Sequence, residues 1–407
     1  MKLWRIAARN IGRNKKRSFL SLSAIAVAVM GIVFFSGYLK GMTGDLVRNV
    51  KTFYSGDIRV QHEDYERYGY LNPLHLRIED FESVAAEIEQ DESVALTSPR
   101  ITFPAAVYRE EETFKATGLG VDFGRETGFQ NLEDYIVEGR MPGAGKNEAL
   151  VGTGLAREIG VGTGDKVTVM TTTMRRGTNA VTFRITGVVR FPLQELNKTR
   201  ILVPLDRAQR LLRMGPSVSE ILVKLKEGAN AAETAARLQE GLGEDVLAFK
   251  TWDEGSVSYG YIKMATAVYN LSALFFFLLA SSVIVNTTMM VVFERVREIG
   301  TIGALGMTRG QIVRLFLFEA LYLGIIGSAA GAVLGIGIVV SLSITGIDLS
   351  NALQGVDMEI SGRIYPALNP VLTIFAFFYS IGIAGLTSLI PSGRAARIEP
   401  VEALRSL

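Results

Sequence analysis

The chain contains few residues whose type and spacing could perform catalysis. Its only histidines, His62 and His75, lack the HExxH spacing of a zinc protease, and no GxSxG elbow for a serine nucleophile is present. Cysteine is absent, which excludes disulfide frameworks, thiolate metal sites and cysteine nucleophiles. We therefore expect no catalytic residue and no metal site in this chain, and we expect both histidines at the surface.

A glycine-rich string from Gly152 to Val167 has the composition of a nucleotide-binding loop. No glycine lies five residues before a Gly-Lys-Ser/Thr sequence, and no GxGxxG can be drawn through the string. We expect a helix followed by tight turns that lead into a strand. Without a phosphate loop, the chain would not hydrolyse ATP unaided, and we expect it to bind no cofactor itself.

A third candidate is a charged segment between two apolar runs. Glycine follows the charges at every third position, and Thr308 with Gln311 three residues later forms a capping-box pattern that would restart a helix. We expect a helix, a charged elbow over residues 294–311 in which the glycines break the helix, and a second helix. Arginine-rich loops are common beside membranes, so charge alone does not assign a role. The charged residues are Glu294, Arg295, Arg297 and Glu298, and the glycines are Gly300, Gly303 and Gly306.

The chain contains four long apolar segments, and two of them flank the elbow. Each has about the 20 residues that a helix needs to cross a bilayer, and 48% of the chain is hydrophobic. We therefore predict a membrane α-helical protein with four transmembrane helices and both termini on one side. The predicted spans are residues 19–39, 268–293, 315–344 and 371–390.

The distribution of charge predicts the orientation of these spans. Residues 1–18 hold seven Lys or Arg and no acid, in the pattern of an amphipathic helix at the membrane surface. A signal peptide is the alternative, but the apolar run after it is too long for one. The elbow and the tail, residues 391–407, are also basic, whereas the loop 346–369 is acidic. The positive-inside rule then predicts cytoplasmic termini and elbow.

The long segment 40–263 lies between the first two spans and has no apolar run long enough to cross a membrane. It carries 28 basic and 33 acidic residues and alternates strand-like and helix-like patterns. We predict a large extracytoplasmic α+β domain of two lobes, divided near residues 139–147, where Gly and Pro concentrate.

Small and charged residues within the third span suggest packing roles. Gly327, Gly331 and Gly335 lie four residues apart on one helix face, which favours either packing within the chain or a dimer seam with a second permease. Glu319 lies about one turn into the span. We expect it to be ion-paired or to reach the interface rather than to transfer protons.

Three stretches resemble one family in order along the chain. The pattern Glu-Arg-x-x-Glu-Ile-Gly-x-x-x-Ala-x-Gly over residues 294–306 resembles the cytoplasmic loop of the FtsX/MacB/Lol superfamily of ABC-transporter permeases. Residues 138–167 and the tail from Pro391 to Arg405 resemble other parts of the same family. The resemblance implies that the elbow is a coupling helix that docks on a separate ATPase subunit, which would bind ATP and Mg²⁺. The implied coupling residues are Glu294, Arg295, Arg297, Glu298, Ile299, Gly300, Ala304, Gly306 and Gln311.

Within the family, the large inserted domain argues against an FtsX-like cell-division regulator, and the lack of a fused ATPase argues against MacB. The resemblance therefore implies a Lol-type (LolC/LolE-like) permease of the bacterial inner membrane, which works by mechanotransmission and extracts lipoproteins for a periplasmic carrier. The implied partners are the ATPase, a second permease that is identical or paralogous, lipoproteins, a carrier and membrane lipids, with no nucleic acid. Export of peptides or other amphiphiles in the manner of MacB, or a peptide-sensing permease module, is the alternative.

The same resemblance suggests where cargo and carrier would bind. Aromatic residues on the first two spans could line a lateral opening for acyl chains, although any lipid-facing helix has such residues. These are Phe34, Phe35, Phe275 and Phe276. The loop that contains Phe191, Pro192 and Leu193 corresponds to a carrier-binding loop of some Lol-type permeases.

A membrane sensor is a hypothesis from a different class. Its outer domain would bind a ligand and signal inward, which requires a cytoplasmic output domain. The longest predicted cytoplasmic segment has only about 20 residues, which is too few for a folded output domain. Sensing would therefore have to act through the ATPase partner.

Overall fold

The computed structural model describes residues 3–13, 15–69, 72–242, 246–254, 257–349 and 362–397. The described residues form two compact units. The helical unit comprises those within Met1–Gly44, Met264–Asp348 and Arg363–Leu407, and the sheet unit comprises those within Asp45–Lys263 and Leu349–Gly362.

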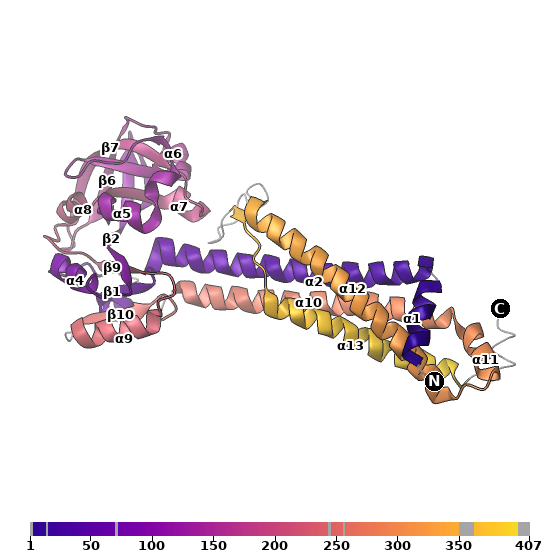
Figure 1. Cartoon of the computed structure of the whole chain (residues 1–407). Coiled ribbons are helices and arrows are strands. Elements are labelled where there is room, and N and C mark those ends of the chain that lie inside the picture. Colours follow the sequence, from indigo (N-terminus) through magenta and orange to yellow (C-terminus); the bar gives the residue numbers. More distant parts are fainter. Residues whose placement is uncertain are drawn as a thin grey trace. The chain divides into compact units, whose positions relative to one another are not determined.

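Among the described residues, six helices contribute to the helical unit, and they can be followed in Figure 1. Four of them are long and apolar enough to cross a membrane, as the sequence predicted. The short β11 (Ile347–Asp348) and β12 (Arg363–Ile364) pair with each other between α12 and α13. The helices are α1 (Leu3–Arg13), α2 (Lys15–Val50), α10 (Val257–Phe293), α11 (Val296–Ala304), α12 (Arg309–Thr345) and α13 (Pro370–Ala395).

The long helices extend beyond the apolar runs that revealed them. The helix α2 begins at Lys15, inside the segment 1–18 that was predicted to be one amphipathic helix, and α10 begins at Val257, before the predicted span 268–293. Likewise, α13 continues through Ala395, into the segment 391–407 predicted to be a tail. Hydropathy marks only the part of a helix suited to lipid. Residues 350–361 of the predicted loop 346–369 and residues 398–407 of the tail lie outside the described residues.

The glycine face of α12 packs against α2 of the same chain. A Cβ atom at Gly327 would lie 2.9 Å from the Cβ of Ile25, and one at Gly335 would lie 2.8 Å from the Cβ of Val33. A side chain at Gly331 would meet the carbonyl oxygen of Ala26. Small residues at this spacing allow two helix backbones to approach closely in lipid. Of the two alternatives for this face, the structure has packing within the chain, so these glycines do not form a dimer seam.

A ten-stranded sheet forms the core of the sheet unit. The neighbour order is β10-β1-β9-β2-β3-β8-β5-β7-β4, and β6 pairs with both β2 and β7. The strands β2, β3, β8, β5, β7 and β6 thus form a closed circuit of hydrogen-bonded strands, which leaves no open edge among them. The strands are β1 (Ile58–His62), β2 (Val94–Arg109), β3 (Glu112–Val121), β4 (Ile136–Gly139), β5 (Glu148–Gly152), β6 (Lys166–Thr172), β7 (Thr178–Val189), β8 (Arg200–Pro204), β9 (Glu220–Leu225) and β10 (Leu247–Thr251).

Short helices cover this sheet and complete the α+β unit. The glycine-rich string folds as α6 followed by turns that enter β6, as the sequence predicted. The helices are α3 (Tyr65–Tyr68), α4 (Phe81–Ile88), α5 (Phe123–Gln130), α6 (Thr153–Ile159), α7 (Gln194–Thr199), α8 (Leu205–Leu212) and α9 (Ala231–Leu242), with a π-helical turn η1 (Lys51–Ser55) and a 3-10 turn η3 (Leu132–Tyr135).

The strand β2 belongs to two sets of strands. Its first residues pair with β9, which continues to β1 and β10, and residues 106–108 pair instead with β6 in the closed circuit. Near the point of exchange, Arg100 is buried, forms an ion pair with Glu126 of α5, and donates a hydrogen bond to the carbonyl of Phe53 in η1. The two sets of strands therefore meet in β2.

The predicted lobe division near residues 139–147 is not where the strand sets divide. The strands before and after this turn, β4 and β5, both pair with β7, so they belong to the same set. The turn itself is closed because the Arg140 guanidinium donates hydrogen bonds of 3.0 and 2.7 Å to Glu148. These bonds lower the pKa of Glu148 to about 2. Gly and Pro mark a tight turn here rather than a boundary.

Candidate functional site: the charged elbow

The charged elbow contains the helix α11, followed by a turn into α12. Gly300 and Gly303 lie inside α11, so the prediction that the glycines break the helix at each position is wrong for these two. Only Gly306 has the positive φ, +94°, that ends a helix. A single glycine in the left-handed region is sufficient to turn the chain, because the preceding backbone hydrogen bonds of α11 can still form.

The restart of the helix follows the capping pattern. Both halves of the capping box between Thr308 and Gln311 form at the start of α12, and the side chain of Gln311 accepts a 3.0 Å bond from the Thr308 amide. An apolar cluster beneath the elbow includes Ile299 of α11, Ile312 and Phe316 of α12, and Ala395 at the end of α13. The elbow is therefore packed on the helices that follow it and is not a loose loop.

A buried ion pair joins the elbow to α12. The Nη1 atom of Arg295 lies 2.5 and 2.6 Å from the two carboxylate oxygens of Glu319, and each side chain is only 4% exposed. The sequence predicted that Glu319 is ion-paired or reaches the interface, and the structure has the ion pair, with Arg295 from the elbow as the partner. Arg295 is thus turned inward, so a coupling role for this residue would act through α12 and not through direct contact with another protein.

Further charges extend this pair to α2. The Nε atom of Arg295 lies 3.6 Å from Glu298, and the Nε atom of Arg17 lies 3.2 Å from Glu294. Arg17 was assigned only to the basic N-terminal cluster, and its link to the elbow could not be read from sequence, because 277 positions separate the two partners.

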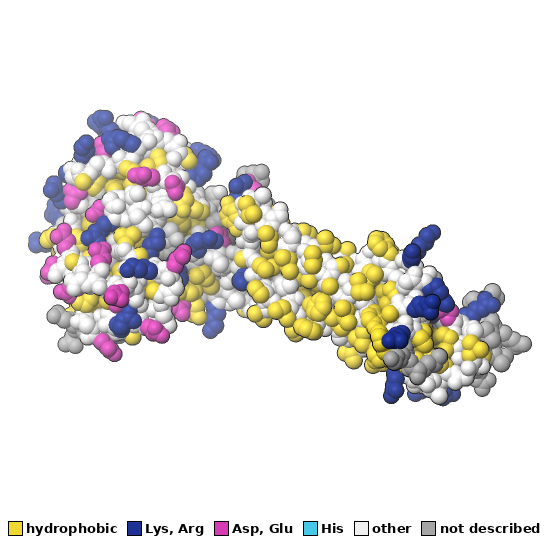
Figure 2. All heavy atoms as spheres, viewed as in Figure 1, with side chains coloured by type: hydrophobic (Ala, Val, Ile, Leu, Met, Phe, Trp, Pro, Cys, Tyr) yellow, Lys and Arg dark blue, Asp and Glu magenta, His cyan; other side chains and the backbone are white. Residues whose placement is uncertain are grey.

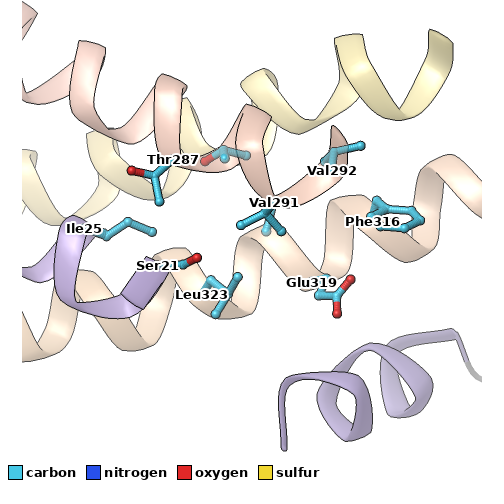
Figure 3. Close-up of a pocket in the computed structure, with 10 residues that line it drawn as sticks. Ser21, Ile25, Thr287, Val291, Val292, Phe316, Glu319 and Leu323 are labelled. Atoms are coloured by element: carbon cyan, nitrogen blue, oxygen red, sulfur yellow. The ribbon is translucent and has the colours of Figure 1, made fainter. Parts of the chain in front are cut away.

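A small cavity lies next to the buried carboxylate (Figure 3). It has a volume of about 10 Å³, close to what one water molecule requires. Figure 3 shows Glu319 and Leu323 of α12, Ser21 of α2 and Val291 of α10 around it. The cavity is too small for a ligand, so these helices meet around a packing defect and not around a binding site.

The exposed part of the elbow differs from the predicted set. Among the predicted coupling residues, Glu294, Arg297, Ala304 and Gly306 are exposed, and Glu298 and Gln311 are half-buried. By contrast, Arg295, Ile299 and Gly300 are buried, so these three support the elbow from inside. Among the elbow residues whose burial the structure describes, the most exposed apolar one is Leu305, at 83%. It was missed, although an apolar residue directly before the terminating glycine is a readable signal.

The aromatic residues proposed to face cargo lie on α2 and α10. The rings of Phe35 and Phe276 stack with their centroids 3.7 Å apart, Phe34 is half-buried, and Phe275 is 60% exposed. In the most apolar window of α10 only 11% of the residues are buried, so most of this helix has no cover from the chain itself. Figure 2 shows hydrophobic side chains covering much of the visible face of the helical unit.

The loop proposed to contact a carrier is mostly internal. Phe191 is 4% exposed and Leu193 is fully buried, and both belong to an apolar cluster of the sheet unit that includes Phe53. Pro192 is half-buried. Phe191 and Leu193 cannot contact another protein in this structure, so their assignment is corrected to a core role. The histidines agree better with expectation, since His75 is exposed and His62 is half-buried.

Comparison with known families identifies the chain. A model of the MacB-like periplasmic core domain matches residues 18–240, which is more than half of the chain, and a model of the FtsX-like permease C-terminal region matches residues 270–400. The chain belongs to the FtsX/MacB/Lol-type family of ABC-transporter permeases. It is accordingly a membrane-embedded transport subunit of the bacterial inner-membrane type.

Relatives within the family cover the chain to different extents. The lipoprotein-releasing system transmembrane protein LolC of Xylella fastidiosa is 23% identical over 97% of this chain and 95% of its own length. LolE of Haemophilus influenzae is 23% identical over 82% of this chain and 83% of its own length. The macrolide export ATP-binding/permease protein MacB of Hyphomonas neptunium is 32% identical, over 29% of this chain and 16% of its own length. The solved periplasmic region of MacB from Actinobacillus actinomycetemcomitans covers 53% of this chain and 92% of its own length, with 13% identity and a TM-score of 0.36.

Proposed function

We propose that this permease subunit receives motion from a separate ATPase through the elbow and passes it along its helices to the sheet unit. The buried pair between Arg295 and Glu319 carries this proposal. Arg295 is the N-cap of α11, and one of its guanidinium nitrogens binds both carboxylate oxygens of Glu319 in a buried site. In this proposal a displacement of α11 is therefore passed directly to α12. The ATPase binds the ATP and Mg²⁺, and this chain binds neither.

The docking surface on the elbow consists of its exposed side chains. Leu305 extends from the turn as an apolar knob, with Arg297 exposed on α11 and Glu298 half-buried nearby. Single exposed apolar residues are common on protein surfaces, so the place of Leu305 on the elbow, directly before the glycine that ends α11, supports the docking role and its exposure alone does not. In this proposal the elbow and both termini are cytoplasmic and the sheet unit is periplasmic, in agreement with the basic residues near the elbow.

We further propose that the cargo is lipoprotein, extracted from the inner membrane and passed to a periplasmic carrier. Similarity to LolC proteins along nearly the whole length of both chains supports this assignment. The stacked Phe35 and Phe276 and the exposed Phe275 offer an apolar seam beside which acyl chains could leave the bilayer. A second permease, identical or paralogous, would complete the transporter.

Export of a peptide or another amphiphile is the second candidate function. It is favoured by the match of residues 18–240 to the MacB-like periplasmic core domain and by the 32% identity to a MacB protein in a shorter segment. The two candidates share the elbow and the mechanism of coupling. They differ only in what the membrane-facing seam and the sheet unit bind.

The coupling proposal is tested with Leu305→Glu. The residue is 83% exposed and is the C-cap of α11, with a φ of −79° and a ψ of 5° that a side chain of any type can adopt, so the change places a charge in the docking surface with little effect on the fold. We expect stimulation of the partner ATPase to fall at least tenfold in proteoliposomes. The matched control is Val137→Glu, an exposed apolar residue of the sheet unit, which should keep full stimulation. Normal stimulation by Leu305→Glu would refute the coupling role.

The cargo proposal is tested in the same proteoliposomes, loaded with a triacylated lipoprotein and supplied outside with a soluble lipoprotein carrier. Release that requires ATP supports lipoprotein extraction. If ATP hydrolysis is coupled but lipoprotein stays in the membrane, while an amphiphilic peptide is moved, the second candidate is correct.

A further inference from the structure

A row of arginines runs along one face of α1. Arg5, Arg9 and Arg13 lie four residues apart, which aligns them on a helix, and all three are exposed. Arg9 and Arg13 have no ion-pair or hydrogen-bond partner among the described residues, and Arg5 lies 5.2 Å from the ring of Trp4. Three exposed cations at this spacing repel one another weakly, and Glu298, the acid that lines a groove with Arg13, lies 3.6 Å from Arg295, so an anion from outside the chain would stabilise the row.

The opposite face of α1 fixes the row in place. Ala7 is fully buried, and Ile11 packs against the apolar cluster shared by the four long helices. The hydroxyl of Ser18 in α2 donates a 2.9 Å hydrogen bond to the carbonyl of Ile11, which sets the angle between the two helices. The arginines are therefore presented by an anchored helix and not by a free tail.

Exposed apolar side chains beside the row indicate the level of the membrane surface. Trp4 is 46% exposed on α1, and Phe19 and Leu20 are 71% and 62% exposed in the second turn of α2, where the apolar run begins. Tryptophan prefers the boundary between headgroups and acyl chains. Because α2 is a candidate span, Phe19 and Leu20 would face acyl chains, and the arginines of α1, which precede them in the chain, would then lie at the level of the headgroups. Figure 2 shows Lys and Arg side chains gathered at this end of the helical unit.

We propose that α1 is a binding site for the headgroups of anionic phospholipids, with Arg5, Arg9 and Arg13 on the phosphates and Trp4 at the acyl boundary. The guanidinium group suits this role because its planar fork donates two parallel hydrogen bonds to a phosphate. A zwitterionic lipid also has a phosphate, but its own cation reduces the gain, so the site should prefer lipids with net negative charge.

The site borders the elbow. Arg13 and Asn10 of α1 line a groove together with Glu298 and Leu305 of the elbow and Gln311 of α12. A headgroup bound at Arg13 would therefore lie beside the proposed docking surface. The ATPase is the competing occupant of the arginine row, and the experiment must separate the two.

Trp4 provides a native probe of the site, because the chain has only two tryptophans and Trp252 belongs to the sheet unit. The Trp252→Phe variant of the full chain is reconstituted in nanodiscs of phosphatidylcholine that contain brominated phosphatidylglycerol or, at equal mole fraction, brominated phosphatidylcholine. Bromine quenches Trp4 emission on contact. Since each arginine near an anionic surface is worth about fivefold in affinity, we expect brominated phosphatidylglycerol to be enriched at Trp4 by at least about tenfold, and less at high salt.

Replacing all three arginines by glutamine should bring this preference close to unity, whereas replacing them by lysine should keep most of it. Equal quenching by the two brominated lipids in the parent protein would overturn the proposal. A preference that survives the glutamine changes would overturn it as well, and if those changes instead abolish capture of the ATPase, the row belongs to the docking surface. The matched control carries Lys115→Gln, Lys166→Gln and Arg175→Gln, three exposed cations of the sheet unit, and should keep the full preference.

Discussion

Removing one partner of the pair between Arg295 and Glu319 should destabilise the helical unit strongly. Both side chains are 4% exposed, so a lone partner would be a nearly dry charge. Such a loss costs about 3–5 kcal/mol. Among the described residues, the only other acid within ion-pair distance of Arg295 is Glu298, at 3.6 Å, and its side chain is 42% exposed. Screening by solvent limits its compensation to about 0–1 kcal/mol.

The two single substitutions should lower the free energy of unfolding by different amounts. Glu319→Leu leaves a guanidinium that cannot lose its proton, whereas Arg295→Met leaves a carboxyl that can become neutral by taking one up. We expect Glu319→Leu to cost about 4 kcal/mol and Arg295→Met about 2–3 kcal/mol. The double variant should recover most of this loss, since two apolar side chains of similar volume can replace a buried pair at little cost.

The assay is thermal unfolding in detergent, followed by Trp4 emission in the Trp252→Phe background so that the signal comes from the helical unit. A loss of about 4 kcal/mol corresponds to a fall in melting temperature of about 10 °C in a unit of this size. The control is Arg297→Met, an exposed arginine two residues from Arg295 in the elbow, which should change the melting temperature by less than about 2 °C. The pair is not energetically coupled if Glu319→Leu has the same melting temperature as the parent. The same conclusion follows if the double variant melts no higher than the less stable single variant.

Three further predictions concern packing and pH. Gly331→Ala should lower the stability of the helical unit by about 1–3 kcal/mol because α2 must move away, while Gly337→Ala, which has open space around its Cβ position, should be neutral in the same melting assay. Phe191→Ala should destabilise the sheet unit by about 3–5 kcal/mol in chemical denaturation, as expected for a buried aromatic, and a surface role would predict almost no change. Because the pKa of Glu148 is lowered from 4.5 to about 2, its carboxylate stabilises the sheet unit above about pH 4.5, and this stability is lost as the pH falls towards 2. Arg140→Gln should flatten the acid-unfolding curve within that window, and an unchanged curve would exclude the pair as its source.

Much of the helical unit was readable from sequence because lipid imposes simple rules on a chain. The apolar runs revealed four helices, and the capping box between Thr308 and Gln311 located the start of α12. The glycine spacing on α12 also predicted a close helix contact, but both alternatives for its partner satisfied the pattern. Only the positions of Ile25 and Val33 on α2 distinguish them, and that contact depends on tertiary structure.

The elbow was recognised from its motif, but the direction in which each residue faces was not. A charged residue such as Arg295 is usually exposed, and its burial becomes understandable only when Glu319 is brought beside it from α12. The same limitation applies to Phe191, since an apolar residue in a loop fits a protein interface and a core equally well. Sequence predicts which residues are unusual, whereas packing decides which of them reach the surface.

The shared strand β2 has a consequence for chimaeras and protein fragments. Because β2 pairs with β9 in its first part and with β6 in its last, neither set of strands is complete without it. A cut in the turn at residues 139–147 would divide one hydrogen-bonded circuit and leave unpaired edges on both pieces. A chimaera between relatives therefore requires transfer of the sheet unit as a whole, or of single surface loops, and recombination at the glycine-rich turn should yield chains that aggregate.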